Sequence, residues 1–247
     1  MKNLIHAELL KLRTTRVFWA YVAAALAFVP VSIALAMTSG QEAAPLESSE
    51  GLRNVMSAAS AGTLLLLLVG ISLMAGEFRH NTVTTTFLIS PDRRRVVAAK
   101  LAAASAVGVG VAVLASLLTL AIALPWLAAR DVEVSLLSSD IGIPVLGALI
   151  GTALAAVVGV GLGALLPNQI LAITVVVVWT SVVDALLVGF APEIGRWLPG
   201  GASSALAGTA TPEGGLLPVW GAAALLAVYG LAFAAAGTRV LERREIT

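Results

Sequence analysis

The chain has 247 residues, of which 59% are hydrophobic and 12% are charged, and its formal net charge is +1. A soluble domain is about 45–50% apolar and about 25% charged, so this composition excludes an ordinary soluble globule. There is no cysteine, which excludes disulfides and thiolate metal sites, and the only histidines are His6 and His80. The composition predicts a polytopic membrane protein.

Six apolar blocks are long enough to cross a bilayer, which takes about 17–25 residues per helix. The blocks are continuously apolar, and backbone hydrogen bonds must close inside each membrane segment, so helices are favoured over strands. The predicted spans are residues 17–37, 55–75, 101–127, 141–166, 170–190 and 217–237. We therefore expect an all-α fold and a single transmembrane domain over residues 1–247.

Lys and Arg are distributed unequally between the two sides that these spans define. With both termini on one side, that side holds twelve of the fifteen cations, and the other holds Arg53, Arg130 and Arg196. Loops rich in Lys and Arg remain cytoplasmic. We expect a multi-pass protein of the plasma (inner) membrane with both termini in the cytoplasm.

Residues 1–16 are predicted to form an amphipathic helix before the first span. Ile5, Leu9 and Leu12 share one helical face, and cations surround them, as in a helix that lies among the inner lipid headgroups. The alternative is a charged tail that only enforces the orientation. The candidate headgroup contacts, here and after the second span, are Lys11, Arg13, Arg16, Arg93, Arg94 and Arg95.

Residues 76–100 form a predicted cytoplasmic segment between the second and third spans. Val83 and Phe87 lie one helical turn apart, Pro91 stops the preceding helix, and three arginines follow. The threonine-rich run disfavours an isolated helix. This element therefore needs packing, either against the third span or against a partner.

The residues that carry a family resemblance are Lys11-Leu12-Arg13-Thr14-Thr15-Arg16, Gly76-Glu77, Thr82, Thr86, Leu88, Pro91, Arg93 or Arg94, Lys100 and Trp197-Leu198-Pro199-Gly200-Gly201. In these positions the sequence resembles the membrane subunits of ATP-binding-cassette (ABC) transporters, in the type-2 permease family of six-span exporters. The likeness extends over the whole chain in span number and loop length. One departure is Asn81, because many members have glycine at this position. Since asparagine tolerates unusual backbone angles better than most residues, this departure is a small one.

The resemblance implies that residues 1–16 are a connecting helix and that residues 77–89 are a coupling helix, which docks in a groove of a separate ATP-binding subunit. It implies two copies of that subunit and a second permease chain, identical or different, in membrane lipid; no nucleic acid is implied. The implied coupling residues are Glu77, Phe78, Thr82, Val83, Thr86, Phe87, Leu88 and Pro91.

The sequence contains no P-loop of the form G-x-x-x-x-G-K-[ST], so this chain is not the ATPase. We expect no catalytic residue, metal or cofactor in this chain, with ATP and Mg on the partner subunit. The expected function is to form the pathway for ATP-driven export (efflux) of a hydrophobic or amphipathic substrate, such as a drug, a peptide antibiotic or a lipid-like molecule.

Asp184 is the only acidic residue well inside a predicted span, with Thr180 and Ser181 one turn before it. A carboxylate inside a membrane is a candidate functional group, so these three residues are candidates for a substrate path. Asp184 could instead simply reach the interface. It also supports an alternative function, an ATP-independent secondary transporter or channel that uses Asp184.

Two further features leave alternatives open. Residues 191–216 are predicted to form an external loop, either re-entrant with Trp197 at the interface or lying on the surface. Gly147 with Gly151, and Gly159 with Gly163, form G-x-x-x-G pairs that allow close helix approach. Such pairs serve a seam between two chains or packing within one chain, or they arise by chance among the 23 glycines.

Overall fold

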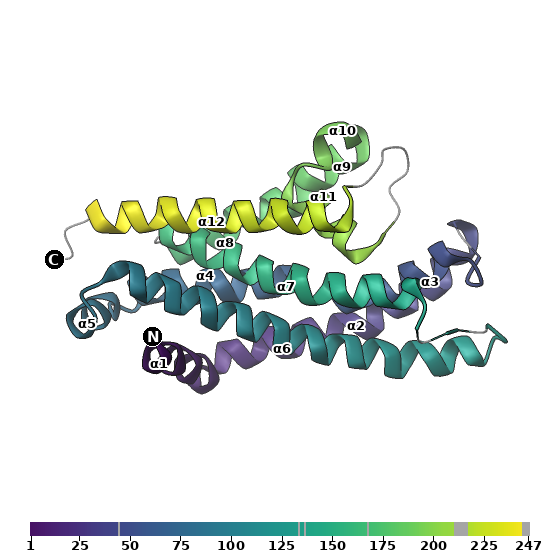
Figure 1. The fold of residues 1–247 in the computed structure, drawn as a ribbon, viewed down its shortest axis with the longest axis horizontal. Helices are drawn as coiled ribbons and strands as arrows, with labels where there is room; N and C mark the ends of the chain where they lie inside the picture. The colour runs from purple at the N-terminus through teal and green to yellow at the C-terminus, as the bar shows by residue number, and fades with distance from the viewer. Residues whose placement is uncertain (44, 133, 136, 167, 210–216, 244–247) are drawn as a thin grey trace.

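The structure is a computed structural model that describes residues 1–247 except 44, 133, 136, 167, 210–216 and 244–247. The described residues form a bundle of helices elongated along one axis, and no β-strand occurs among them (Figure 1). Six described stretches are long and apolar enough to cross a membrane: Arg16–Thr38, Ser49–Arg79, Arg93–Ala128, Ser139–Leu165, Gln169–Phe190 and Val219–Glu242. The predicted all-helical fold with six candidate spans is confirmed.

Several of these stretches contain more than one helical element. The second consists of α3, the 3-10 turn η1 and α4, and the fifth consists of α8, the π-helical segment η2 and α9. The elements from the start of the chain are α1 (Lys2–Thr14), α2 (Arg16–Ala43), α3 (Ser49–Met56), η1 (Ser57–Ser60), α4 (Thr63–Arg79), α5 (Val83–Ile89) and α6 (Arg93–Ala128). They continue with α7 (Ser139–Leu165), α8 (Gln169–Val178), η2 (Trp179–Asp184), α9 (Ala185–Phe190), α10 (Pro192–Gly195), α11 (Pro199–Ala207) and α12 (Val219–Arg243).

Two short helices lie across one end of the bundle. Figure 1 views α1 and α5 nearly end-on, whereas the long helices run across the picture, and α12 also ends on this side. The start of the chain, the connection between the second and third spans and the last described helix therefore share one end, as the predicted topology requires. The connections after α2, α6 and α9 lie toward the opposite end.

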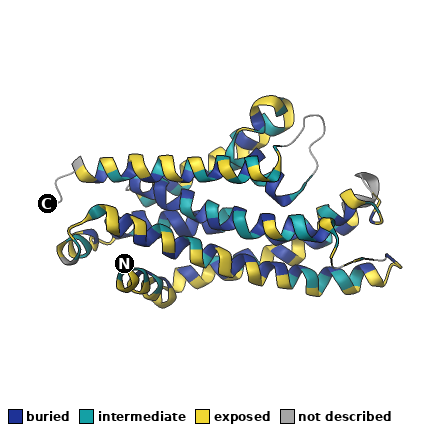
Figure 2. Ribbon diagram, in the orientation of Figure 1, coloured by how far each residue is buried: buried dark blue, intermediate teal, exposed yellow. Residues whose placement is uncertain are grey.

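The centre of the bundle is α7, which packs against α4, α6 and α12. Buried residues make up 61% of the apolar window in the spans containing α4 and α7, but only 17% in Gln169–Phe190. Figure 2 shows exposed residues along the outer sides of α6 and α12, with α7 mostly buried or half-buried. The core therefore lies around α7, and the other spans turn broad apolar faces outward.

Glycines on α7 allow its backbone to touch its neighbours. A Cβ on Gly159 would lie 2.0 Å from the Leu67 carbonyl oxygen of α4, and a Cβ on Gly147 would lie 1.7 Å from the Leu206 carbonyl oxygen of α11. A Cβ on Gly163 would lie 2.8 Å from the Ile71 carbonyl oxygen of α4, and a Cβ on Gly151 would lie 3.3 Å from the Leu206 side chain. Both G-x-x-x-G pairs thus serve packing within this chain.

The described part of the predicted external loop is largely helical. Helix α11 packs against α7 and α12, and its Ala202 and Leu206 are 0% and 1% exposed. It ends at Gly208, whose φ of 73° lies in the left-handed region that glycine adopts readily. Residues 210–216 of that loop lie outside the described residues.

The contact between α7 and α4 predicts the effect of one added methyl group. We expect Gly159→Ala to lower the stability of the purified protein by about 1–3 kcal/mol, because the new Cβ forces the two backbones apart. Thermal unfolding in detergent measures the effect. Gly110→Ala on α6 is the matched control, since its Cβ would meet nothing within 4 Å. Equal unfolding temperatures for the two variants would contradict the packing described here.

Candidate functional site

A left-handed residue separates α4 from α5. Asn81 has a φ of 54°, the Thr82 N–H donates to the Glu77 carbonyl (2.9 Å), and the Asn81 N–H donates to the Phe78 carbonyl (3.3 Å). This pair of bonds is the Schellman motif, which commonly places glycine or asparagine at the left-handed position. The coupling helix implied over residues 77–89 is thus two elements: the last turn of α4, and α5.

Helix α5 is anchored on one side and open on the other. Val83 is 6% exposed, and Phe87 is half-buried with the Arg93 guanidinium 5.3 Å from its ring centroid. Thr84 and Thr85 are exposed, and Leu88 is 78% exposed. Packing against its own chain therefore stabilises this threonine-rich helix, while an apolar side chain remains available on its outer face.

The implied coupling residues divide by exposure. Thr82, Leu88 and Pro91 are exposed, and Phe78, Thr86 and Phe87 are partly buried. The side chains of Glu77 and Val83 are buried. The first group is thus accessible at the surface, whereas the side chains of Glu77 and Val83 face the interior of this chain.

Glu77 belongs to a buried network of charges. The Lys100 side chain is 0% exposed, and its ammonium group donates to Glu77 Oε1 (2.8 Å), to Glu8 Oε2 (2.7 Å) and to the Leu73 carbonyl (3.1 Å). Glu8 lies on α1 and is 3% exposed. Lys100, in the second turn of α6, therefore joins α1 to the end of α4.

Lys11 closes this network into a ring. Its ammonium group lies 2.8 Å from Glu8 Oε1 and 2.9 Å from Glu77 Oε1. Burial lowers the pKa of Lys11, but hydrogen bonds and charge attraction from Glu77 and Glu8 outweigh it, so its pKa is raised and it stays protonated. We call Glu8, Lys11, Glu77 and Lys100 the charge ring; its formal charges sum to zero.

The charge ring is not among the sites predicted from the sequence, because Glu8 is not one of the candidate residues. Two signals were present: Glu8 is the only acidic residue among the first sixteen, and it lies three residues before Lys11. The pairing with Lys100 gives no local signal, since the two residues are 92 positions apart.

Most cations proposed to contact lipid headgroups have partners within the chain. Lys11 is in the charge ring, and Arg93 donates to the Leu241 carbonyl at the end of α12. Arg94 pairs with Glu242 (2.8 Å) and Arg95 with Asp92 (3.0 Å). The side chains of Arg13 and Arg16 are exposed.

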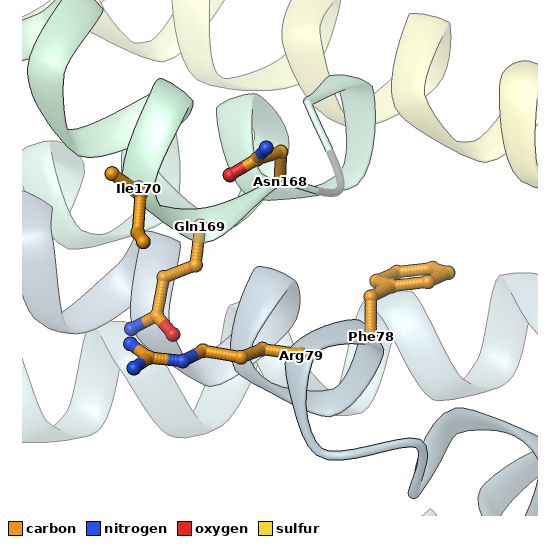
Figure 3. A pocket seen from close by; sticks show the side chains of 5 residues that line it. All are labelled: Phe78, Arg79, Asn168, Gln169 and Ile170. Atoms are coloured by element: carbon orange, nitrogen blue, oxygen red, sulfur yellow. The ribbon is translucent and has the colours of Figure 1, made fainter.

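An open groove of about 320 Å³ lies between the end of α4 and the start of α8. Figure 3 shows Phe78 and Arg79 coming from the end of α4, and Asn168, Gln169 and Ile170 from the start of α8. Gln169 also donates to the Ser72 hydroxyl (3.1 Å), which ties α8 to α4. Among the described residues, no group of three or more His, Asp or Glu side chains is placed to hold a metal ion.

Asp184 is the last residue of η2, in the fifth span, and it is 2% exposed. Its Oδ2 accepts from the Gly200 N–H (2.8 Å), and its Oδ1 accepts from the Trp179 indole N–H (3.1 Å). Asp184 thus caps the first turn of α11, where a carboxylate is favourable. Both of its oxygens accept hydrogen bonds from this chain.

The other two candidates for a substrate path do not join Asp184. The Thr180 hydroxyl donates to the Val176 carbonyl of its own helix (2.9 Å), and the Ser181 side chain is exposed. The π-helical segment η2 includes both residues and ends at Asp184. The three polar side chains thus form no shared hydrogen-bonded group.

The Asp184 contacts predict a structural effect. We expect Asp184→Ala to destabilise the protein by about 1–3 kcal/mol, because the Gly200 N–H and the Trp179 indole N–H lose their acceptor. Asp184→Asn keeps one oxygen and loses less. Thermal unfolding, with hydrogen exchange at Gly200, measures both. Thr180→Val is the control on the same span, and an Asp184→Ala variant as stable as this control would contradict the capping role.

The family model described as ABC-2 family transporter protein matches residues 4–186. The matched region contains the whole charge ring, α5 and the first four candidate spans. No curated protein matches the chain. Since the family match covers most of the sequence, and six helices are long and apolar enough to span a membrane, this multi-pass membrane protein belongs to the ABC-2 family of ABC transporter permeases.

Proposed function

We propose that this chain forms the membrane pathway for ATP-driven export of a hydrophobic or amphipathic substrate, and that α5 is the element on which a separate ATP-binding subunit acts. The observation that carries the proposal is α5 itself. It is a short helix held across one end of the bundle, between two spans, with Leu88 78% exposed outside those spans.

The connections of α5 suit the transfer of motion. On one side the Schellman motif ties α5 to the last turn of α4. On the other side Asp92 caps α6, its Oδ1 accepting from the Arg95 N–H (3.2 Å). Because few residues separate these elements, a displacement of α5 acts directly on the cytoplasmic ends of α4 and α6 and tilts them between two packings.

The partner is a subunit that carries a P-loop, two copies of which would act on two permease chains. ATP and Mg belong to that subunit. The second permease is a natural neighbour for the fifth span, which has the least buried apolar window of the six and exposes Leu171, Val175, Val178 and Leu186.

The orientation and the substrate class follow from the distribution of polar groups. Twelve of fifteen cations lie on the α5 side in the proposed topology, which favours a cytoplasmic location for that end in the plasma membrane. The spans turn mostly apolar side chains outward, and Asp184 has both oxygens engaged. An apolar or amphipathic cargo fits such surfaces better than an ion, and this favours an ATP-driven exporter over a transporter that uses Asp184.

Leu88 provides the test. We expect Leu88→Lys to reduce recovery of the P-loop subunit by roughly tenfold when the tagged permease is purified from host membranes, because a charge replaces an apolar contact. Mass spectrometry identifies the subunit by its P-loop sequence.

Leu137→Lys is the matched control for this experiment. Leu137 is 98% exposed and lies in the connection between α6 and α7 at the opposite end of the bundle, so the same substitution there leaves recovery unchanged. Equal recovery with Leu88→Lys and Leu137→Lys would contradict docking at α5. Absence of any P-loop subunit from the parent complex would overturn the proposed function as a whole.

A further inference from the structure

We propose that Lys100 is a positioning residue that locks α1 onto the end of α4 through the charge ring, so that α1 and α5 move as one unit during the transport cycle. We call this attachment of α1 to α4 the lock, and it depends only on residues of this chain. The joint motion rests on the proposed function, since it requires a subunit that moves α5.

One face of helix α1 is buried against the helical bundle. Leu12 is 7% exposed and packs in a core cluster with Phe18, Val22 and Leu73, and Glu8 lies one turn before it on the same face. Leu10, on the other side of the helix, is 54% exposed. The apolar stripe expected to face lipid therefore packs partly on the bundle, with a carboxylate at its centre.

The buried carboxylate makes this docking specific. Apolar contacts alone would allow α1 to slide or rotate, because they have no direction. Glu8 has one position in which both oxygens meet ammonium groups, Oε2 at Lys100 and Oε1 at Lys11. Lifting α1 away would leave Lys100 buried in the bundle with half of its carboxylate partners gone, and unpaired buried charge is strongly disfavoured.

The ring meets α5 at Glu77. The Glu77 side chain accepts from Lys100 and Lys11, while its backbone carbonyl accepts from the Thr82 N–H, the bond that sets the direction of α5. The same residue thus ends α4, orients α5 and contacts the ring. A displacement of α5 that tilts this turn therefore also displaces α1.

Another ion pair on α6 provides the contrast. Arg94 pairs with Glu242, but the two side chains are 78% and 37% exposed. Exposed pairs contribute little, because water and salt screen them. Arg94→Met therefore removes a cation from the same helix without loosening α1.

The natural absence of cysteine allows a direct test. His6→Cys on α1 and Thr84→Cys on α5, both at exposed positions, carry two spin labels, and pulsed electron resonance measures the distance between them. The complex with its ATP-binding subunit is examined without nucleotide and trapped with ATP and vanadate. We expect one narrow distance distribution that is the same in both states.

Lys100→Met in this background is expected to broaden the distribution roughly twofold, since the lock is lost. Lys100→Arg, which keeps the charge, restores the narrow distribution, and Arg94→Met leaves it unchanged. Glu8→Gln is the second variant if Lys100→Met does not insert, because it alters α1 and leaves the spans intact. It is also expected to broaden the distribution.

Each remaining outcome is decisive. A narrow distribution in both Lys100→Met and Glu8→Gln overturns the lock. An α1–α5 distance that changes between the two nucleotide states of the parent overturns the joint motion. If no ATP-binding subunit copurifies, the proposed function and the joint motion fail together, while the nucleotide-free measurement on the permease alone still decides the lock.

Discussion

The structure depends on close backbone contact along α7. Between membrane helices, lipid is as apolar as the side chains it replaces, so association relies on packing and hydrogen bonds. Gly159 and Gly147 bring α7 against the backbones of α4 and α11, and Gly161 brings it to within contact of α12, where a Cβ would lie 2.7 Å from the Ala234 nitrogen. These contacts fix the spans relative to one another and allow polar features to concentrate at the ends.

Different parts of the bundle use buried charge differently. At the α5 end, four side chains from α1, α4 and α6 neutralise one another in the charge ring. In the fifth span, Asp184 is satisfied by two neutral donors, the Gly200 N–H at the start of α11 and the Trp179 indole N–H of its own span. In addition Arg53 and Asp140 pair at 2.8 Å between α3 and α7, with side chains 35% and 15% exposed. Each charged group thus ties together elements that the apolar surfaces alone would leave free to slide.

The sequence predicted the fold class, the number of candidate spans and the family, because each depends on long apolar runs or local motifs. The sequence also indicated that Asn81 replaces a glycine common in the family, and its left-handed φ of 54° is one that asparagine tolerates. It did not predict the break between α4 and α5, the inward direction of Glu77 or the partners of Lys100. Those depend on which helices lie side by side, and no local pattern in a single sequence encodes the contact of Glu8 with a residue 92 positions away.

That separation also has a consequence for how the protein is made. Chains are synthesised from the N-terminus, so α1 emerges long before α6 supplies Lys100. Before Lys100 is synthesised, Glu8 can pair only with Lys11 of its own helix. Helix α1 then lacks part of the surface against which it packs in the complete bundle. Synthesis of the third span then supplies Lys100, the second ammonium group that Glu8 contacts, so the charge ring can close only after α6 has begun to form.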